Sequence, residues 1–276
     1  MRPIAVTAYA KECWNALEKP NLVTLIYEAY IKLRKQGEPD ISIVIPAYNE
    51  EKNILQTLFS LCNNVTDKAV EIVVVNNNSK DKTEELVLTT GVRCVLETRQ
   101  GITSARNAGL AAANGKYILN ADADSIYPKD WVNEMCKPFY THKDVAVVYG
   151  RFSFVPIGKT NRLTYFVYEY VTDFNRFLNK YIKDEAVNVY GFNSGFKRED
   201  GVAVEGFNHP PGTNEDGWLA LKLRDKGYGK LYAVTNIKAL VWTSDRRIQM
   251  DGGFVKATIT RIKRILFKQG VERNDL

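Results

Sequence analysis

Short apolar runs alternate with helical stretches between residues 41 and 119. The apolar runs have the length of buried strands, and the stretches between them repeat apolar side chains at the spacing of amphipathic helices. The runs cover residues 41–46, 72–75, 92–96 and 117–119, and the helical stretches cover residues 51–63, 81–90 and 103–114. Strands and helices in this order are typical of a parallel sheet with helices on both faces. The pattern therefore predicts an α/β fold with a Rossmann-type central sheet.

Helical patterns flank this alternation. Residues 1–38 predict one or two helices that end at Gly37 and Pro39, so we expect an N-terminal helical appendage, a main domain over residues 39–250 and a third part over residues 251–276. Between Asn161 and Lys183 the pattern predicts a long helix. Core packing is the usual role of an aromatic stripe, and the alternative is an apolar wall for a lipid-linked or aromatic acceptor. The aromatic residues of this helix are Tyr165, Phe166, Tyr168, Tyr170, Phe174, Phe177 and Tyr181.

The chain has 276 residues, of which 45% are hydrophobic and 25% are charged. This length allows one large α/β domain or two small ones, and the composition excludes disordered, collagen-like and disulfide-scaffold proteins. The longest stretch without a charged residue has 14 residues (53–66), whereas a bilayer-spanning helix needs about 18 to 20. We therefore expect no membrane-spanning segment.

The four cysteines are widely spaced and form no C-x-x-C motif, which favours packed thiols in a reducing compartment. The first ten residues resemble a signal peptide only weakly, because Thr7 interrupts the apolar stretch and Lys11 follows it. We therefore expect a cytoplasmic protein, either free or peripherally bound to the inner face of the membrane.

Five of the six net positive charges lie between residues 238 and 276, where nine Lys and Arg face four Asp and Glu. Between Phe254 and Lys268, apolar residues recur at helical spacing among five basic residues, so this segment predicts a basic amphipathic helix. Such a helix either contacts an anionic membrane surface or docks on the domain with its basic face in water, and we favour the second interpretation. Nucleic acid is not expected as a partner, because no nucleic-acid motif accompanies the charge.

Asp122 and Asp124 follow directly on the predicted strand 117–119. If the chain stays extended there, side chains two residues apart point to the same side, and both carboxylates face one cation. Carboxylates suit Mg²⁺ or Mn²⁺, which also bind substrate phosphates. The alternative is a turn or a helix cap, in which Asp is common. Other nucleotide motifs fail, since residues 109–116 depart from the phosphate-binding loop and no G-x-G-x-x-G follows a predicted strand.

Asn214, Glu215 and Asp216 open the helical stretch 217–226. Acids at a helix start are favoured by the helix dipole, so a purely structural role would explain them. The functional interpretation makes Asp216 a general base. At a helix N-terminus we expect the pKa of Asp216 to be low, so it would be a weak base. A weak base is sufficient if the acceptor hydroxyl loses its proton late, while it attacks a carbon with oxocarbenium character.

The order and spacing of these motifs resemble the family 2 glycosyltransferases, which are inverting, nucleotide-sugar-dependent enzymes of the GT-A fold. The resemblance runs from Ile41 to about Arg247. Its segments are residues 42–50 as the opening strand and nucleotide loop, residues 71–81 as the second strand and nucleotide-contacting loop, residues 101–115 as the helix before the metal motif, residues 122–124 as that motif, and residues 206–228 around the catalytic base.

The resemblance implies that Asp122 and Asp124 hold Mn²⁺ or Mg²⁺ on the donor diphosphate and that Asp216 takes the proton from an acceptor hydroxyl. It implies direct displacement by a hexosyltransferase. The acceptor would be a glycan, a lipid-linked molecule or another hydroxyl compound, in cell-envelope polysaccharide synthesis. The donor-binding residues that it implies are Pro46, Ala47, Tyr48, Glu50, Asn76, Asn78, Arg106 and Asp122.

The sequence departs from the family pattern at two places. Asn76 stands where the family usually has an Asp that accepts a hydrogen bond from uracil. Asn offers a donor and an acceptor, so a UDP-sugar is our first expectation and another base, such as guanine, is the alternative. No histidine follows Asp216 as an extra metal ligand. Arg246 and Arg247 lie near that place, where they either bind a diphosphate or a phosphorylated acceptor or remain surface residues.

Two other functions stay open at this stage. One is a non-catalytic sugar-nucleotide or glycan-binding protein on the same fold, which Asn76 permits. The other is a sugar nucleotidyltransferase, which also needs a metal and diphosphate site. Against the second, no Gly-rich triphosphate loop with Arg or Lys follows the first predicted strand.

Overall fold

The computed structural model describes residues 1–250, 252–253 and 256. The basic helix predicted between Phe254 and Lys268 lies outside the described residues, as does nearly all of the third part expected over residues 251–276. None of the described helices is long and apolar enough to cross a membrane. The four cysteines are free thiols, and Cys13, Cys62 and Cys136 are buried, as expected for packed thiols.

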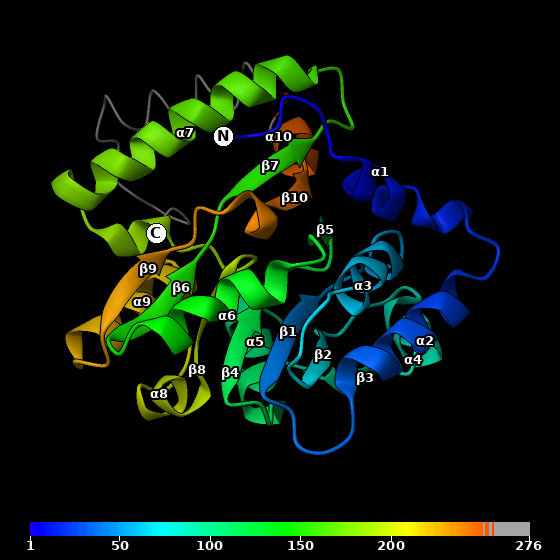
Figure 1. Ribbon diagram of the computed structural model, residues 1–276, viewed down its shortest axis with the longest axis horizontal. Coiled ribbons are helices and arrows are strands. Elements are labelled where there is room, and N and C mark those ends of the chain that lie inside the picture. Colours follow the sequence, from blue (N-terminus) through cyan, green and yellow to red (C-terminus); the bar gives the residue numbers. More distant parts are fainter. Residues whose placement is uncertain (251, 254–255, 257–276) are drawn as a thin grey trace.

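Seven strands form the central sheet, in the order β3-β2-β1-β4-β8-β6-β9 (Figure 1). Of these strands, β8 alone runs antiparallel to its neighbours. The four predicted apolar runs form β1 to β4, so the predicted mostly parallel sheet is confirmed. The strands are β1 (Ile41–Ala47), β2 (Val70–Asn76), β3 (Arg93–Leu96), β4 (Tyr117–Asn120), β6 (Val145–Tyr149), β8 (Ser194–Lys197) and β9 (Lys230–Ala233).

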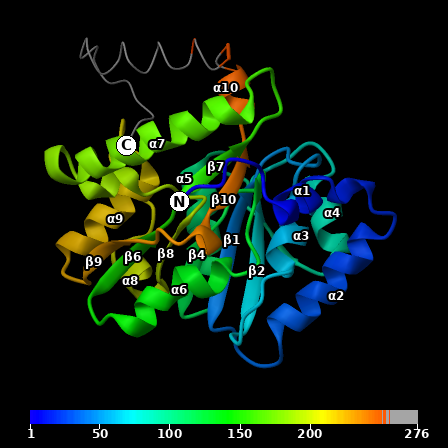
Figure 2. The same ribbon diagram turned by 45° about the horizontal axis from the view of Figure 1, so that its top comes forward.

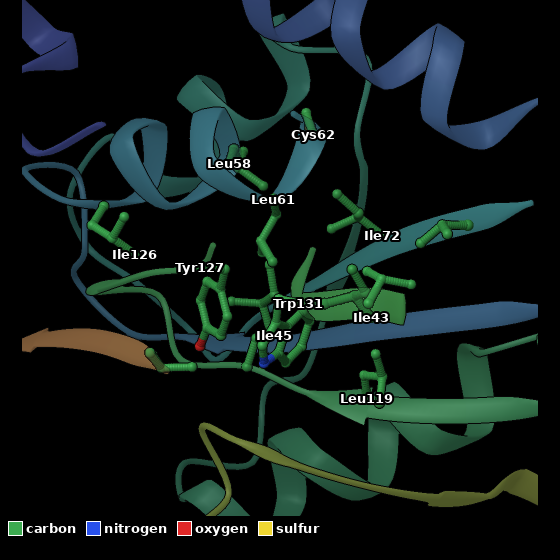
Figure 3. Packing of buried hydrophobic residues seen from close by; sticks show 14 of the residues in the cluster. Ile43, Ile45, Leu58, Leu61, Cys62, Ile72, Leu119, Ile126, Tyr127 and Trp131 are labelled. Atoms are coloured by element: carbon green, nitrogen blue, oxygen red, sulfur yellow. The ribbon is translucent and has the colours of Figure 1, made fainter. Parts of the chain in front are cut away.

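Successive side chains of a strand point to opposite faces of the sheet, so a fully apolar strand presents apolar side chains on both faces. Helices cover both of these faces. Ile43 and Ile45 of β1 pack in the larger core cluster with Leu58 of α3, whereas Val44 packs with Ala105 of α5. Figure 3 shows Leu58 and Leu61 on the helix above the strands that carry Ile43 and Leu119. The helices around the sheet are α2 (Leu22–Arg34), α3 (Ile54–Cys62), α4 (Thr83–Thr89), α5 (Ile102–Ala112), α6 (Trp131–Thr141), α8 (Arg198–Ala203) and α9 (Glu215–Asp225).

The N-terminal helices share the core of the main domain. α1 (Ala8–Trp14) and α2 both contact α3, with a short 3₁₀ helix η1 (Ala16–Glu18) between them. Cys13 and Ile26 are fully buried in the same cluster as Ile43. The first 38 residues therefore add a packed layer to the sheet domain.

A second, three-stranded sheet and a long helix lie beyond the ends of the main strands (Figures 1 and 2). Its strand order is β5-β10-β7. Arg246 begins the short helix that follows β10, and Ile248 of that helix packs against Phe154 and Tyr165. The elements of this region are β5 (Ser125–Ile126), β7 (Phe152–Val155), α7 (Arg162–Ile182), η2 (Glu185–Asn188), η3 (Ile237–Ala239), β10 (Val241–Ser244) and α10 (Arg246–Met250).

The aromatic helix predicted over residues 161–183 exists as α7, but the expected core packing is wrong for most of its rings. Tyr165 is fully buried, whereas Tyr170, Phe174, Phe177 and Tyr181 are exposed. The reason is that charged side chains occupy much of the side of α7 that faces the protein, where Arg2 binds Asp173 and the backbone N–H of Phe154 donates to Glu169.

Candidate active site

A cavity of about 310 Å³ opens at the carboxyl ends of β1 and β4. Parallel strands place the loops that follow them at this edge, which is where ligands bind in open α/β sheets. The residues expected at the site that line the cavity are Pro46, Ala47, Tyr48, Glu50, Asp122 and Asp124. Its other lining residues are Asn77, Gln100, Gly101, Ile102, Ala105, Ala123 and Arg246.

Asp122 and Asp124 reach this cavity from a turn. The strand β4 ends at Asn120, and residues 123 and 124 form the turn, so the expectation of an extended chain is wrong. Buried core side chains fix the turn: Asp122 N–H donates to Tyr127 Oη at 2.8 Å, and Thr57 Oγ1 donates to the Ala123 carbonyl at 2.9 Å. The two carboxylates thus share one cavity through the geometry of a turn that the core holds in place.

Each acid of this pair has its own arginine. Arg106 of α5 is buried, and its Nη2 lies 3.2 Å from Asp122 Oδ1. Arg246 donates to Asp124 Oδ2 at 2.8 Å and to Glu50 Oε1 at 2.7 Å. Hydrogen bonding to Glu50 is the main reason that the pKa of Arg246 is raised. Carboxylates from two different loops thus surround one guanidinium, so this wall of the cavity suits positive charge.

The carboxylates fit a divalent cation when substrate oxygens complete its coordination. Within residues 1–250, 252–253 and 256, no three His, Cys, Asp or Glu side chains cluster as a metal site. Mg²⁺ commonly uses one or two carboxylates together with substrate phosphates and water. Asp122 and Asp124 supply two carboxylates to one cavity. The residues present therefore fit the expected Mn²⁺ or Mg²⁺ bound together with a diphosphate.

Asp216 lies on the other side of Arg106, whose Nε is 3.3 Å from Asp216 Oδ1. Asn214 caps α9 by accepting the backbone N–H of Asp216 at 3.0 Å. Burial raises the pKa of Asp216 to about 7, although Arg106 acts to lower it. The expected low pKa is therefore wrong, because removing this carboxylate from water outweighs both the helix N-terminus and the ion pair.

Gly191 fits against both Arg106 and Asp216. A Cβ at position 191 would collide with Arg106 Nη2 and with the Asp216 carboxylate, so the ion pair depends on a glycine at this position. The two residues beside Gly191 are aromatic, and their rings contact a third ring from β7. These half-buried rings belong to Tyr190, Phe192 and Phe152.

Two asparagines expected at the donor site do not line the cavity. Asn76 is buried at the end of β2, where its Nδ2 donates to Glu84 Oε2 at 2.8 Å and its Oδ1 accepts the Ser79 N–H at 3.0 Å. Both groups expected to bind the base are therefore engaged within the protein. Asn78 is half-buried and accepts a hydrogen bond from Lys80 Nζ. A role of either asparagine in donor binding stays a prediction.

Comparison with known proteins identifies the family. The sequence model described as "Glycosyl transferase family 2" matches residues 42–201, which is more than half of the chain. The chain belongs to glycosyl transferase family 2. Among its relatives, the probable glycosyltransferase YdaM of Bacillus subtilis is 34% identical over 132 residues, which cover 44% of this chain and 31% of that protein. The chondroitin synthase of Escherichia coli is 32% identical over 114 residues, covering 39% and 17%. The matched segment thus spans a third or less of these two relatives.

Solved structures of glycosyltransferases share the fold. The mannosyltransferase PcManGT from Pyrobaculum calidifontis, in complex with GDP-Man and Mn²⁺, has a TM-score of 0.56 at 22% identity, covering 92% of this chain and 75% of that one. The glucosyl-3-phosphoglycerate synthase of Mycobacterium tuberculosis, in complex with Mn²⁺, UDP and phosphoglyceric acid, has a TM-score of 0.55 at 22% identity, covering 87% and 81%. The GT-A-like fold expected of family 2 is confirmed.

Motif reasoning missed several residues that line the cavity of this family 2 protein. Asn77, next to the expected Asn76, donates to the Glu97 and Arg99 carbonyls and accepts the Gly101 N–H, so it shapes the loop that carries Gln100. The position of Asn77 in the loop after the predicted strand 72–75 was the sequence signal that could have identified it. Asp216 and Arg246, which the motifs did single out, lie beyond residue 201, where the family match ends, and of the two only Arg246 lines the cavity.

Proposed function

We propose that this family 2 protein is an inverting glycosyltransferase that moves a sugar from a nucleoside-diphosphate sugar to an acceptor hydroxyl. One observation carries the proposal: the buried Arg106 joins Asp122, an acid of the cavity, to Asp216, a buried carboxylate with a raised pKa. A donor site and a candidate base are thus held next to each other by one guanidinium. A protein that only binds a sugar nucleotide does not need the buried carboxylate of Asp216. Burying that carboxylate costs free energy, which catalysis would explain.

In the proposed reaction, the acceptor oxygen forms a bond to the anomeric carbon while the bond from that carbon to the diphosphate oxygen breaks. The acceptor proton passes to a carboxylate oxygen of Asp216, and the electron pair leaves with the nucleoside diphosphate. A base whose pKa is about 7 is well matched to neutral pH. Arg246 lines the cavity from the side of Asp124 and Glu50, where its fork can bind diphosphate oxygens.

Asp122 and Asp124 would hold the divalent cation, and a bound Mn²⁺ or Mg²⁺ supplies electrostatic stabilisation of the leaving diphosphate. Complexes of fold neighbours with Mn²⁺ and either GDP-Man or UDP are in keeping with this assignment. A UDP-sugar remains our first proposal for the donor. The alternative is a guanine nucleotide, because Asn76 replaces the usual acid and its side-chain amide is hydrogen-bonded to Glu84 and Ser79.

The acceptor would enter beside Asp216, past the rings of Tyr190 and Phe192. Aromatic faces beside a base suit the apolar faces of a sugar ring, which favours a glycan or glycoconjugate as acceptor. We place the reaction in the synthesis of such a molecule.

Donor binding and turnover of Asp216→Asn test this proposal, with Glu215→Gln as the matched control on the same helix turn. Calorimetry with UDP and GDP and Mn²⁺ measures binding, and release of nucleoside diphosphate from the donor, with water as acceptor, measures turnover. Asp216→Asn should bind like the wild type and turn over at least about a hundredfold more slowly, whereas Glu215→Gln should keep its activity. Equal turnover of wild type and Asp216→Asn would refute the assigned base. Pyrophosphate release from a nucleoside triphosphate and a sugar phosphate would instead indicate a nucleotidyltransferase.

A further inference from the structure

The outer side of α7 is a continuous apolar surface. Eight of the 23 large apolar side chains that are exposed in the described part of the chain lie on this one helix. At 3.6 residues per turn they fall within an arc of about 140° along a helix about 31 Å long. We call this set the apolar face of α7. It consists of Leu163, Val167, Tyr170, Val171, Phe174, Phe177, Tyr181 and Ile182.

The opposite side of α7 carries its charges and faces the protein. Glu169 is buried and accepts two hydrogen bonds from Arg162 at 2.9 Å, and Asp173 accepts two from Arg2 at 2.7 Å. Arg176 donates to the Gly150 carbonyl at 2.9 Å. This helix is therefore inverted with respect to a surface helix in water, whose apolar side faces the core. Exposed apolar patches of this kind mark contact surfaces.

The charges around the face favour an anionic occupant. Glu169 and Asp173, the two acids of α7, are held against the protein by β7 and by Arg2. Lys159 and Lys183 are exposed near the two ends of the helix, whereas Lys180 lies on the charged side of α7 and pairs with Glu185. Pairing with a second copy of this face would bring lysines against lysines, whether the two helices ran parallel or antiparallel. A lipid surface with anionic headgroups can contact the apolar face and the lysines at the same time.

The position of α7 relates this face to the site. The helix lies across the edge at which the parallel strands end (Figures 1 and 2). From its C-terminal end the chain continues through η2, where Asn188 donates to the Arg176 carbonyl, to Gly191 beside Asp216. The side of the molecule that would take the acceptor is therefore the side that carries the exposed rings.

We propose that the apolar face of α7 binds in the interfacial region of an anionic bilayer. The rings of Phe174 and Phe177 enter the headgroup and acyl boundary, Tyr170 and Tyr181 lie at headgroup level, and Lys159 and Lys183 contact lipid phosphates. This surface consists only of residues that the structure describes. It requires no donor, so it stands apart from the proposed reaction.

Vesicle flotation of the full chain tests the proposal, with phosphatidylcholine vesicles that contain or lack phosphatidylglycerol. The test variant is Phe174→Glu with Phe177→Glu, whose side chains are 59% and 58% exposed; the matched control is Leu88→Glu with Val202→Glu, at 57% and 53%. We expect the test variant to bind anionic vesicles about tenfold or more weakly and the control to change less than about twofold. In Phe174→Trp, brominated lipid should quench the new fluorophore more strongly than the four native tryptophans.

Three results would overturn the proposal. The first is vesicle binding that is absent in the wild type or unchanged in the test variant. The second is a test variant that loses a dimer seen for the wild type by sedimentation, since a second copy would then cover the face. The third is a test variant whose melting temperature falls well below that of the control, because the face would then be covered by this chain itself. Calorimetric binding of UDP or GDP should be unaffected in every variant, which separates this proposal from the proposed reaction.

Discussion

The raised pKa of Asp216 predicts a steep dependence of turnover on pH. A base must be ionised to accept a proton, and the pKa of about 7 results from burial that outweighs the ion pair with Arg106. Such a group is about 9% ionised at pH 6 and about 91% ionised at pH 8, so the rate should fall about tenfold between them. An acid at its ordinary pKa of 3.8 would be fully ionised over this range and would give a flat profile.

Release of nucleoside diphosphate from the donor, measured from pH 5.5 to 8.5 with saturating Mg²⁺, provides the assay. The diphosphate of a nucleotide sugar does not titrate over this range, so the profile reports on the protein. The same carboxyl can be observed directly by ¹³C NMR of labelled aspartate, with Asp216→Asn to assign the signal. A flat rate profile together with a carboxyl signal that titrates near pH 4 would refute the argument that burial controls this group.

Stability should show the opposite trend with pH. The pKa of Asp216 in the folded protein lies above its value of 3.8 in an unfolded chain, so the folded state binds the extra proton between about pH 4 and 7. The stabilisation from this group is therefore complete below about pH 4 and is lost as the pH rises through about 7. Asp216→Asn should lack this contribution, and the difference in melting temperature between variant and wild type measures it.

Three further substitutions test the site and the core. Arg246→Ala should weaken binding of a nucleoside diphosphate about tenfold or more by calorimetry, because charge-assisted hydrogen bonds are lost; Arg246→Lys should recover only part of the affinity, and unchanged affinity in both would remove Arg246 from the donor site. Gly191→Ala should abolish turnover while the fold survives, since the new Cβ collides with Arg106 and Asp216; wild-type rates would show that the ion pair is dispensable. Leu58→Ala, in the core beneath α3, should cost about 2 to 5 kcal/mol in urea unfolding, and a loss below about 1 kcal/mol would contradict the packing described.

Periodicity along the chain predicted the parallel part of the fold well. Apolar runs in the order strand, helix, strand lead to β1, β2, β3 and β4, and such local patterns need no knowledge of distant contacts. They also place residues 46–50 and 122–124 at one edge of the sheet, where the cavity lies. β8 runs antiparallel between β4 and β6, and the sequence had no signal for it, because strand order depends on where the chain crosses the sheet.

Side-chain environments depended on contacts between distant parts of the chain. Glu50 and Arg246 are 196 residues apart, and their ion pair exists only because β10 returns to the cavity. Asp216 has a raised pKa because folding buries it, although its place at a helix start suggests the reverse. Asn76 matches a family position, but Glu84 and Ser79 engage its amide. Spacing within a motif cannot report such partners.

The helix α7 shows most clearly which features the sequence determined and which the tertiary structure decided. Its sequence alone determined a long helix with a stripe of apolar and aromatic side chains, since helical spacing is a local property. Which side of that helix faces the protein was decided by the tertiary structure, in which Arg2 binds Asp173 and Ser153 donates to Glu169. These contacts direct the charged side inward, and the rings are left on the surface. A hydrophobic stripe predicts burial only when no better partner exists for the opposite side of the helix.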